Sequence, residues 1–147
     1  MVDAAELFGR RGVPERAAQA WATLASIALA RERPEEAAAA GREASELLAN
    51  SQTVALRLWS EVQIARVDAG LGDLEGAFRR LDRVLAESRR KGLVLLEYEA
   101  RLARAQTERA GHPAATGPLA QLAADAEAQG LLRIARKAAR SAGLPAP

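Results

Sequence analysis

The sequence predicts an all-α fold, a right-handed solenoid of antiparallel helical hairpins with about three repeats and a C-terminal capping helix. Three observations support this. Among 147 residues there are 36 Ala and 20 Leu, which are strong helix formers. Aromatic residues make up only 3% of the chain and β-branched residues are scarce, although both types favour strands. Finally, similar segments recur every 38 to 40 positions, a spacing that indicates a repeat protein.

Three alanine-centred segments define the repeat. Their last residues are Ala37, Ala77 and Ala115, which lie 40 and then 38 positions apart. The chain begins partway through a repeat, so we expect a single domain over residues 1–147 that starts with a partial unit. Its expected parts are a partial repeat at 1–12, repeats at about 13–51, 52–91 and 92–130, a capping helix at 131–142 and a tail at 143–147.

Turn residues place two helices in each repeat. Pro14 and Pro34 suit a first helical turn, where the missing amide costs nothing, and Asp73 can cap the helix that follows it. Pro118 also needs a first turn, so its helix is expected to begin no earlier than about Ala114. The expected helices span 2–9, 14–31, 35–49, 53–70, 73–90, 93–109, 115–129 and 131–142.

The glycines and the spacing of apolar residues also support two helices in each repeat. Gly92 and Gly130 stand where a left-handed residue would close a helix. The segment 73–90 has one apolar stripe, whereas 93–109 has two, the second of which begins at Leu95. Helices with one and two apolar sides should alternate in a stack of hairpins, because each hairpin buries its face on the next.

The repeats resemble the tetratricopeptide family. The matching pattern is a large residue, a Leu–small pair and small residues on the second helix, and its first copy is Trp21, Leu24, Ala25, Ala28, Ala37, Gly41 and Ala44. Glu61 and Glu99 replace a favoured aromatic, and Asp68 and Gln106 replace a favoured Tyr. Residues 130–138 look like the end of long-unit repeat regions in bacterial multidomain regulators.

The resemblance implies a groove lined by the first helices, which accepts peptides or partner helices, and it brings no catalytic residues. It also implies that the chain is a scaffold or sensor arm of a larger bacterial signalling protein. The alternative is self-assembly, in which two copies pair through the open N-terminal face near Leu7 and Phe8.

Composition excludes much catalytic chemistry. The chain has no Cys and a single His, His112, so disulfides, thiolate nucleophiles, Cys-ligated metals and multi-His sites cannot form within it. Phosphate-loop and dinucleotide glycine motifs are absent from the sequence. We therefore expect no enzyme activity, no metal and no cofactor.

The net charge and the hydropathy of the chain limit the classes of partner that we expect. A net charge of +2 is too small to drive strong binding to a polyanion, so a nucleic-acid partner is not expected. No targeting segment or membrane span is visible, which predicts a cytoplasmic protein without a membrane partner.

The predicted groove lies on the unpacked side of the first helices, and its candidate residues are Trp59, Gln63, Arg66, Glu97, Arg101 and Arg104. The three arginines could form a cationic floor for an acidic peptide, because guanidinium binds carboxylate in a bidentate way. The alternative is that they pair with Glu97, Glu61 and Glu108 on a solvated face. Trp59 is either a core residue or a groove anchor.

A basic stripe follows on the last expected helix. Arg133, Arg136, Lys137 and Arg140 fall at positions i, i+3, i+4 and i+7 with no acidic residue among them. One interpretation is the polar outer face of a capping helix. The other is a docking surface for an acidic partner or for phosphate.

Overall fold

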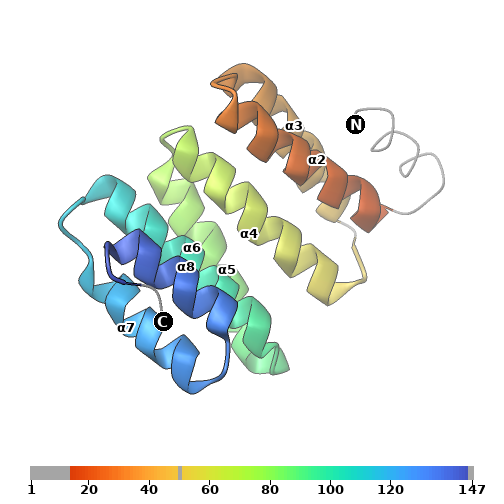
Figure 1. Cartoon of the computed structure of the whole chain (residues 1–147). Coiled ribbons are helices and arrows are strands. Elements are labelled where there is room, and N and C mark those ends of the chain that lie inside the picture. Colours follow the sequence, from red (N-terminus) through yellow and green to blue (C-terminus); the bar gives the residue numbers. More distant parts are fainter. Residues whose placement is uncertain (1–13, 50, 146–147) are drawn as a thin grey trace. The chain divides into compact units, whose positions relative to one another are not determined.

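The computed structural model describes residues 14–49 and 51–145, which form seven helices and no strand (Figure 1). The helices are α2 (Pro14–Ala30), α3 (Pro34–Leu48), α4 (Val54–Gly70), α5 (Leu74–Lys91), α6 (Val94–Gly111), α7 (Gly117–Ala128) and α8 (Leu132–Ala142). Every end lies within two residues of its expected position, so the all-α prediction is confirmed for this part of the chain. The helix expected at 2–9 and the partial repeat at 1–12 lie outside the described residues.

Residue contacts divide the chain into two compact units. Unit 1 ends at Arg80 and unit 2 begins at Leu81, so the boundary falls within α5. The prediction of one continuous stack of hairpins over the whole chain stays a prediction.

Unit 1 is held together by small side chains. The α2–α3 hairpin packs together, and α4 packs against both of its helices. The buried residues between these helices are mainly alanines, with Leu48, Ile64 and Val67 as the larger members. Alanine lets helix axes approach at the short end of the usual range of about 8–10 Å.

Unit 2 has a core of larger residues. Helix α6 packs against α7 and α8, which also pack against each other. The buried cluster between them contains alanines together with the larger residues Tyr98, Leu102, Leu119, Leu122 and Ile134.

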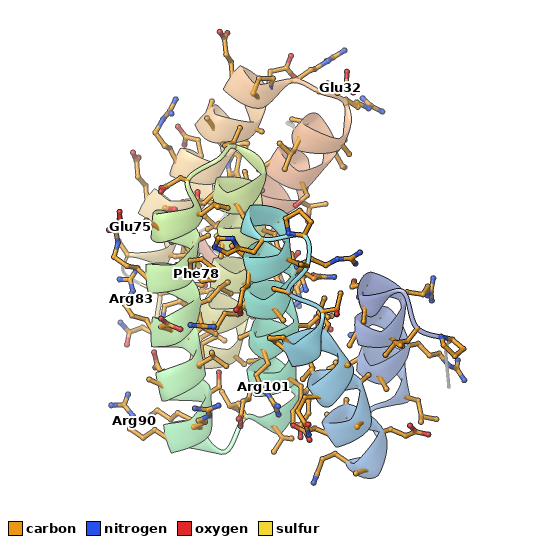
Figure 2. The ribbon with its side chains drawn as sticks, turned by 90° about the vertical axis from the view of Figure 1, so that its left-hand side faces the viewer. Glu32, Glu75, Phe78, Arg83, Arg90 and Arg101 are labelled. Atoms are coloured by element: carbon orange, nitrogen blue, oxygen red, sulfur yellow. The ribbon has the colours of Figure 1, made fainter. Side chains whose placement is uncertain are left out.

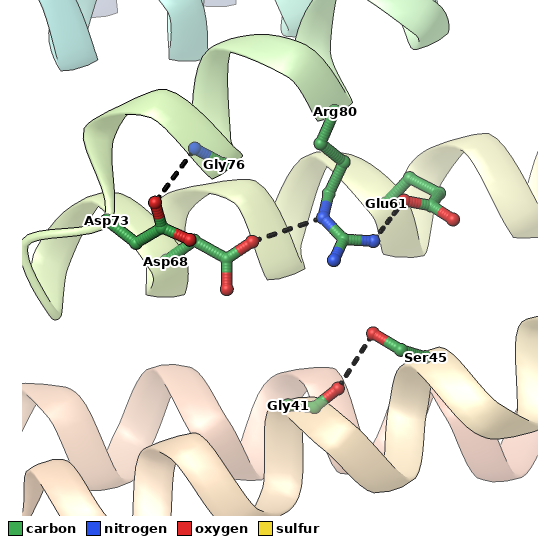
Figure 3. Close-up of polar contacts among 7 residues, drawn as sticks. All are labelled: Gly41, Ser45, Glu61, Asp68, Asp73, Gly76 and Arg80. Atoms are coloured by element: carbon green, nitrogen blue, oxygen red, sulfur yellow. Dashed lines mark hydrogen bonds and ion pairs between the residues drawn. The ribbon is translucent and has the colours of Figure 1, made fainter.

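The predicted helix boundaries have the expected local chemistry. The Asp73 carboxylate accepts a hydrogen bond from the Gly76 amide at 2.9 Å and caps α5 (Figure 3). Gly92 and Gly130 follow α5 and α7 with φ angles of 67° and 73°. Pro118 is in the first turn of α7.

The distribution of buried residues confirms the predicted faces of α5 and corrects one detail of α6. In α5, Leu81, Val84 and Ser88 are buried, whereas Arg83 and Arg90 point away from the helix (Figure 2). In α6 the residues from Tyr98 to Ala105 are largely buried, but Leu95 is 52% exposed. Leu95 is exposed because it belongs to the first turn, before the buried stretch begins.

Over the described residues, no helix combines the length and the apolar character needed to cross a bilayer.

Candidate interaction site

Unit 2 contains an open depression between α5, α6 and α7, with a volume of about 420 Å³. Its apolar floor is formed by Leu85, Ala105 and Leu122, all of which are buried. Its polar lining consists of Asp82, Arg89, Arg101, Arg104, Glu108 and Gln121. Two of the predicted groove residues, Arg101 and Arg104, therefore lie together on this depression.

Arg101 is held in place from two sides. Its guanidinium forms an ion pair with Asp125 and lies 4.7 Å from the centre of the Tyr98 ring. Burial alone would lower the pKa of Arg101, but the hydrogen bond to Asp125 and the attraction of that carboxylate raise it overall. The hydrogen bonds from Arg101 and Gln121 in turn lower the pKa of Asp125.

Arg104 is paired more loosely. Its Nε donates to Asp82 at 2.8 Å, and its Nη1 lies 3.8 Å from a Glu108 oxygen. The side chains of Arg104 and Asp82 are 41% and 57% exposed. Exposed pairs of this kind contribute about 0–1 kcal/mol to stability, so the exchange of Asp82 for another carboxylate would cost little.

The remaining candidate groove residues are placed elsewhere. Glu97 accepts a hydrogen bond from Arg89 at 2.8 Å. Gln63 and Arg66 lie together on α4 in unit 1, joined by a 3.3 Å hydrogen bond. Trp59, on the same helix, is partly buried.

Unit 1 contains an ion-pair cluster that the sequence did not predict. Arg80 on α5 binds Glu61 and donates through Nε to Asp68 at 3.1 Å (Figure 3). These three side chains are only 20% to 24% exposed. Burial raises the pKa of Asp68 more than the Arg80 guanidinium lowers it. For Arg80, burial acts to lower the pKa, but the two carboxylates raise it overall.

The signal for this cluster was present in the sequence. Glu61 and Asp68 are both departures from the tetratricopeptide pattern and lie seven positions apart, on one face of a helix. The corresponding departures in unit 2 also have polar partners. Glu99 accepts a hydrogen bond from Arg133 at 2.8 Å, and Gln106 donates to Ser141 at 2.9 Å.

The predicted basic stripe is exposed on α8. Arg133, Arg136, Lys137 and Arg140 all lie on the solvent side of the helix. The opposite side, formed by Ile134, Ala135, Ala138 and Ala139, is buried in unit 2.

Unit 1 has a depression of its own, between α3, α4 and α5, with a volume of about 350 Å³. Gly41, Ile64 and Val67 supply apolar lining, and Asp68 and Arg80 are part of its polar lining. The polar lining of this depression therefore already contains a paired acid and base.

Comparisons with other proteins add no further assignment. No protein-family profile, no curated protein and no solved structure matches this chain. Within the part of the chain that the structure describes, no group of three or more His, Cys, Asp or Glu residues is placed to hold a metal ion.

Proposed function

We propose that this chain is a non-enzymatic interaction module that binds an acidic, aliphatic segment of a partner protein in the depression of unit 2. The observation that carries the proposal is the position of Arg101 and Arg104 beside a buried apolar floor. This combination suits a segment in which an aliphatic side chain stands next to a carboxylate.

The apolar part of the depression provides the contact for the aliphatic side chain. Leu122 is 2% exposed and Leu85 is 8% exposed, so both are fixed by the core beneath them. A partner residue packed on this floor would gain about 25 cal/mol for each Å² of apolar surface removed from water.

The two arginines have different roles in the proposal. Arg101 is oriented by Asp125 and Tyr98 and presents a fixed guanidinium, whose five N–H groups exceed what one carboxylate can occupy. Arg104 exchanges its weak, exposed contact with Asp82 for a carboxylate of the partner. Charge-assisted bonds of this type are stronger than neutral ones.

The proposal extends to the architecture of the whole chain. We propose that its hairpins stack as a right-handed, tetratricopeptide-like solenoid in a larger bacterial regulatory protein. The recurrence of Ala37, Ala77 and Ala115 and the packed hairpins within each unit support this arrangement.

Affinity measurements with a defined probe test the binding proposal. The probe is a short fluorescein-labelled peptide in which leucines alternate with aspartates, and fluorescence polarisation reports its binding. Arg104→Ala should weaken binding about tenfold, because a lost charged hydrogen bond costs about 1.5 kcal/mol or more.

The matched control is Arg79→Ala, which removes an exposed arginine outside the depression that pairs with Glu75 on its own helix. It should leave the affinity unchanged. Equal losses in both variants, or equal binding of a peptide with lysine in place of aspartate, would contradict the proposal.

A further inference from the structure

Helix α8 presents a face of a single charge sign. Its exposed side carries Arg133, Arg136, Lys137 and Arg140, and the segment Leu132–Ala142 contains no acidic residue. The buried side, centred on Ile134 and Ala138, fixes the rotation of the helix about its axis. The four cations are therefore held on one face by the core of unit 2.

A helix that only keeps a repeat array soluble does not need this pattern. The exposed charges of α5 include both signs, and opposite charges pair within the helix as Arg79 with Glu75 and as Arg90 with Glu87 at 4.0 Å. Mixed signs are what solubility favours, because they avoid a large field of one sign. The single sign on α8 instead favours an anionic partner.

One cation of this face is oriented in advance. Arg133 donates to Glu99 at 2.8 Å, and the Glu99 side chain is only 10% exposed, whereas Arg133 itself is 68% exposed. The ion pair with Glu99 orients the Arg133 guanidinium, while most of the Arg133 side chain stays accessible to solvent. An oriented side chain loses less conformational entropy when a partner binds.

Apolar side chains stand at both ends of the same helix. Leu132 is 49% exposed in the first turn, and Leu144, just after the last turn, is 45% exposed. Apolar contacts of this kind add to a protein–protein interface, whereas phosphate binding to a nucleic acid does not need them.

We infer that this α8 basic face, Leu132 to Leu144, docks an acidic amphipathic helix of a partner protein. Glutamates of that helix face Arg133, Lys137 and Arg140, and its apolar residues contact Leu132 and Leu144. The surface shares no residue with the depression of unit 2, so the inference goes beyond the proposed function.

Three probes separate the possible occupants. The first is a synthetic helical peptide with glutamates spaced three and four residues apart and leucines at both ends. The others are a short DNA duplex and vesicles of phosphatidylcholine with phosphatidylserine. The full chain should bind the peptide more tightly than either of the other two.

The decisive variant is the double substitution Lys137→Glu and Arg140→Glu. Both side chains are exposed, so circular dichroism should match that of the wild type, and peptide affinity should fall at least tenfold. The milder pair Lys137→Gln and Arg140→Gln should give an intermediate loss and covers the case in which charge reversal impairs folding.

A control completes the experiment. Arg83→Glu changes an exposed side chain of α5 that does not line the depression, and it should leave the affinity for the helical peptide within twofold. Unchanged binding by both double variants, absence of peptide binding, or tighter binding to DNA or vesicles would overturn the inference.

Discussion

Glu32 occupies a backbone position for which its side chain is poorly suited. Its φ angle is 58°, and the amide of Arg33 bonds back to the Ala28 carbonyl at 2.9 Å. Gly72 occupies the same place in the next hairpin, 40 positions later, with a φ of 92°. The left-handed region costs a residue with a Cβ atom about 1–2 kcal/mol.

Glu32→Gly should therefore raise the free energy of unfolding by about 0.5–1 kcal/mol, since the greater freedom of glycine in the unfolded chain offsets part of the gain. The reverse change, Gly72→Ala, should lower it by about 1 kcal/mol. Urea unfolding monitored by circular dichroism measures both. A loss of stability in Glu32→Gly would show that the Glu32 side chain contributes more than its backbone conformation costs.

Ser60 and Ser88 form a second matched pair. Both are fully buried, but the Ser88 hydroxyl donates to the Val84 carbonyl at 2.6 Å, whereas the Ser60 hydroxyl has no partner among the described residues. A buried polar group without a partner costs about 1–3 kcal/mol. Ser60→Ala should thus stabilise the protein by about 1 kcal/mol, and Ser88→Ala should not, which thermal unfolding can compare directly.

Asp68 should make stability depend on pH in an unusual direction. Its folded pKa is raised from the ordinary value of 3.8, mainly by burial. Between the ordinary and the raised pKa the folded state binds more protons than the unfolded state, so this residue's contribution to stability falls as pH rises through that window.

Asp68→Asn should remove that fall, because the amide does not titrate. Asp125→Asn is the opposite case, since the pKa of Asp125 is lowered by its hydrogen bonds from Arg101 and Gln121. The Asp125 carboxylate contributes to stability above its ordinary pKa, and this contribution is lost as pH falls toward the lowered pKa. Urea unfolding midpoints measured from pH 3 to pH 7 test both variants. A change of the pH profile in the same direction in both would contradict this account.

Individual polar partners could not be predicted from the sequence. Glu61 was one of the acids expected to pair with a groove arginine, and it binds Arg80 instead. Glu97 binds Arg89. Such choices depend on which helix faces lie opposite each other, and side-chain spacing along one helix does not specify the neighbouring helix. Of the pairs expected for the groove arginines, the Arg104–Glu108 contact could be derived locally, because these residues are four positions apart on one helix.

At the scale of the elements, prediction succeeded because the signals are local. Proline in first turns, the Asp73 cap and the glycines after α5 and α7 each act through the backbone of a few neighbouring residues. The amphipathic face of α8 was also readable, since the rotation of a helix follows from its apolar residues. Leu95 was expected to be packed but is exposed. The periodicity of apolar residues does not show how far along a helix its neighbours extend.

The cap of α5 provides a test at this scale. Asp73→Ala should lower the free energy of unfolding by about 1 kcal/mol, since it removes the bond to the Gly76 amide. Thr53 precedes α4, but its side chain makes no capping hydrogen bond. Thr53→Ala is therefore the control and should change stability little, as judged by the same unfolding measurement. Equal effects of the two substitutions would contradict the assigned cap.

At the scale of the whole molecule, each unit has a depression, and two positions that line the first recur in the second at the sequence spacing of 38. Val67 and Arg80 line the one in unit 1, and Ala105 and Pro118, each 38 positions later, line the one in unit 2. The polar linings of the two depressions differ, because the depression of unit 1 contains the Asp68–Arg80 pair and that of unit 2 contains Arg101 and Arg104. Binding preference in this account therefore comes from the few polar side chains in which the two depressions differ.

The most direct test of the docking proposal is a methyl NMR titration of the full chain with the aspartate–leucine peptide. The account predicts saturable shifts of the Leu85 and Leu122 methyl signals, which lie on the floor of the unit 2 depression, together with shifts of the Arg104 side-chain N–H signals. Shifts confined to Ile64 and Val67 in unit 1, or no saturable shift at all, would contradict it.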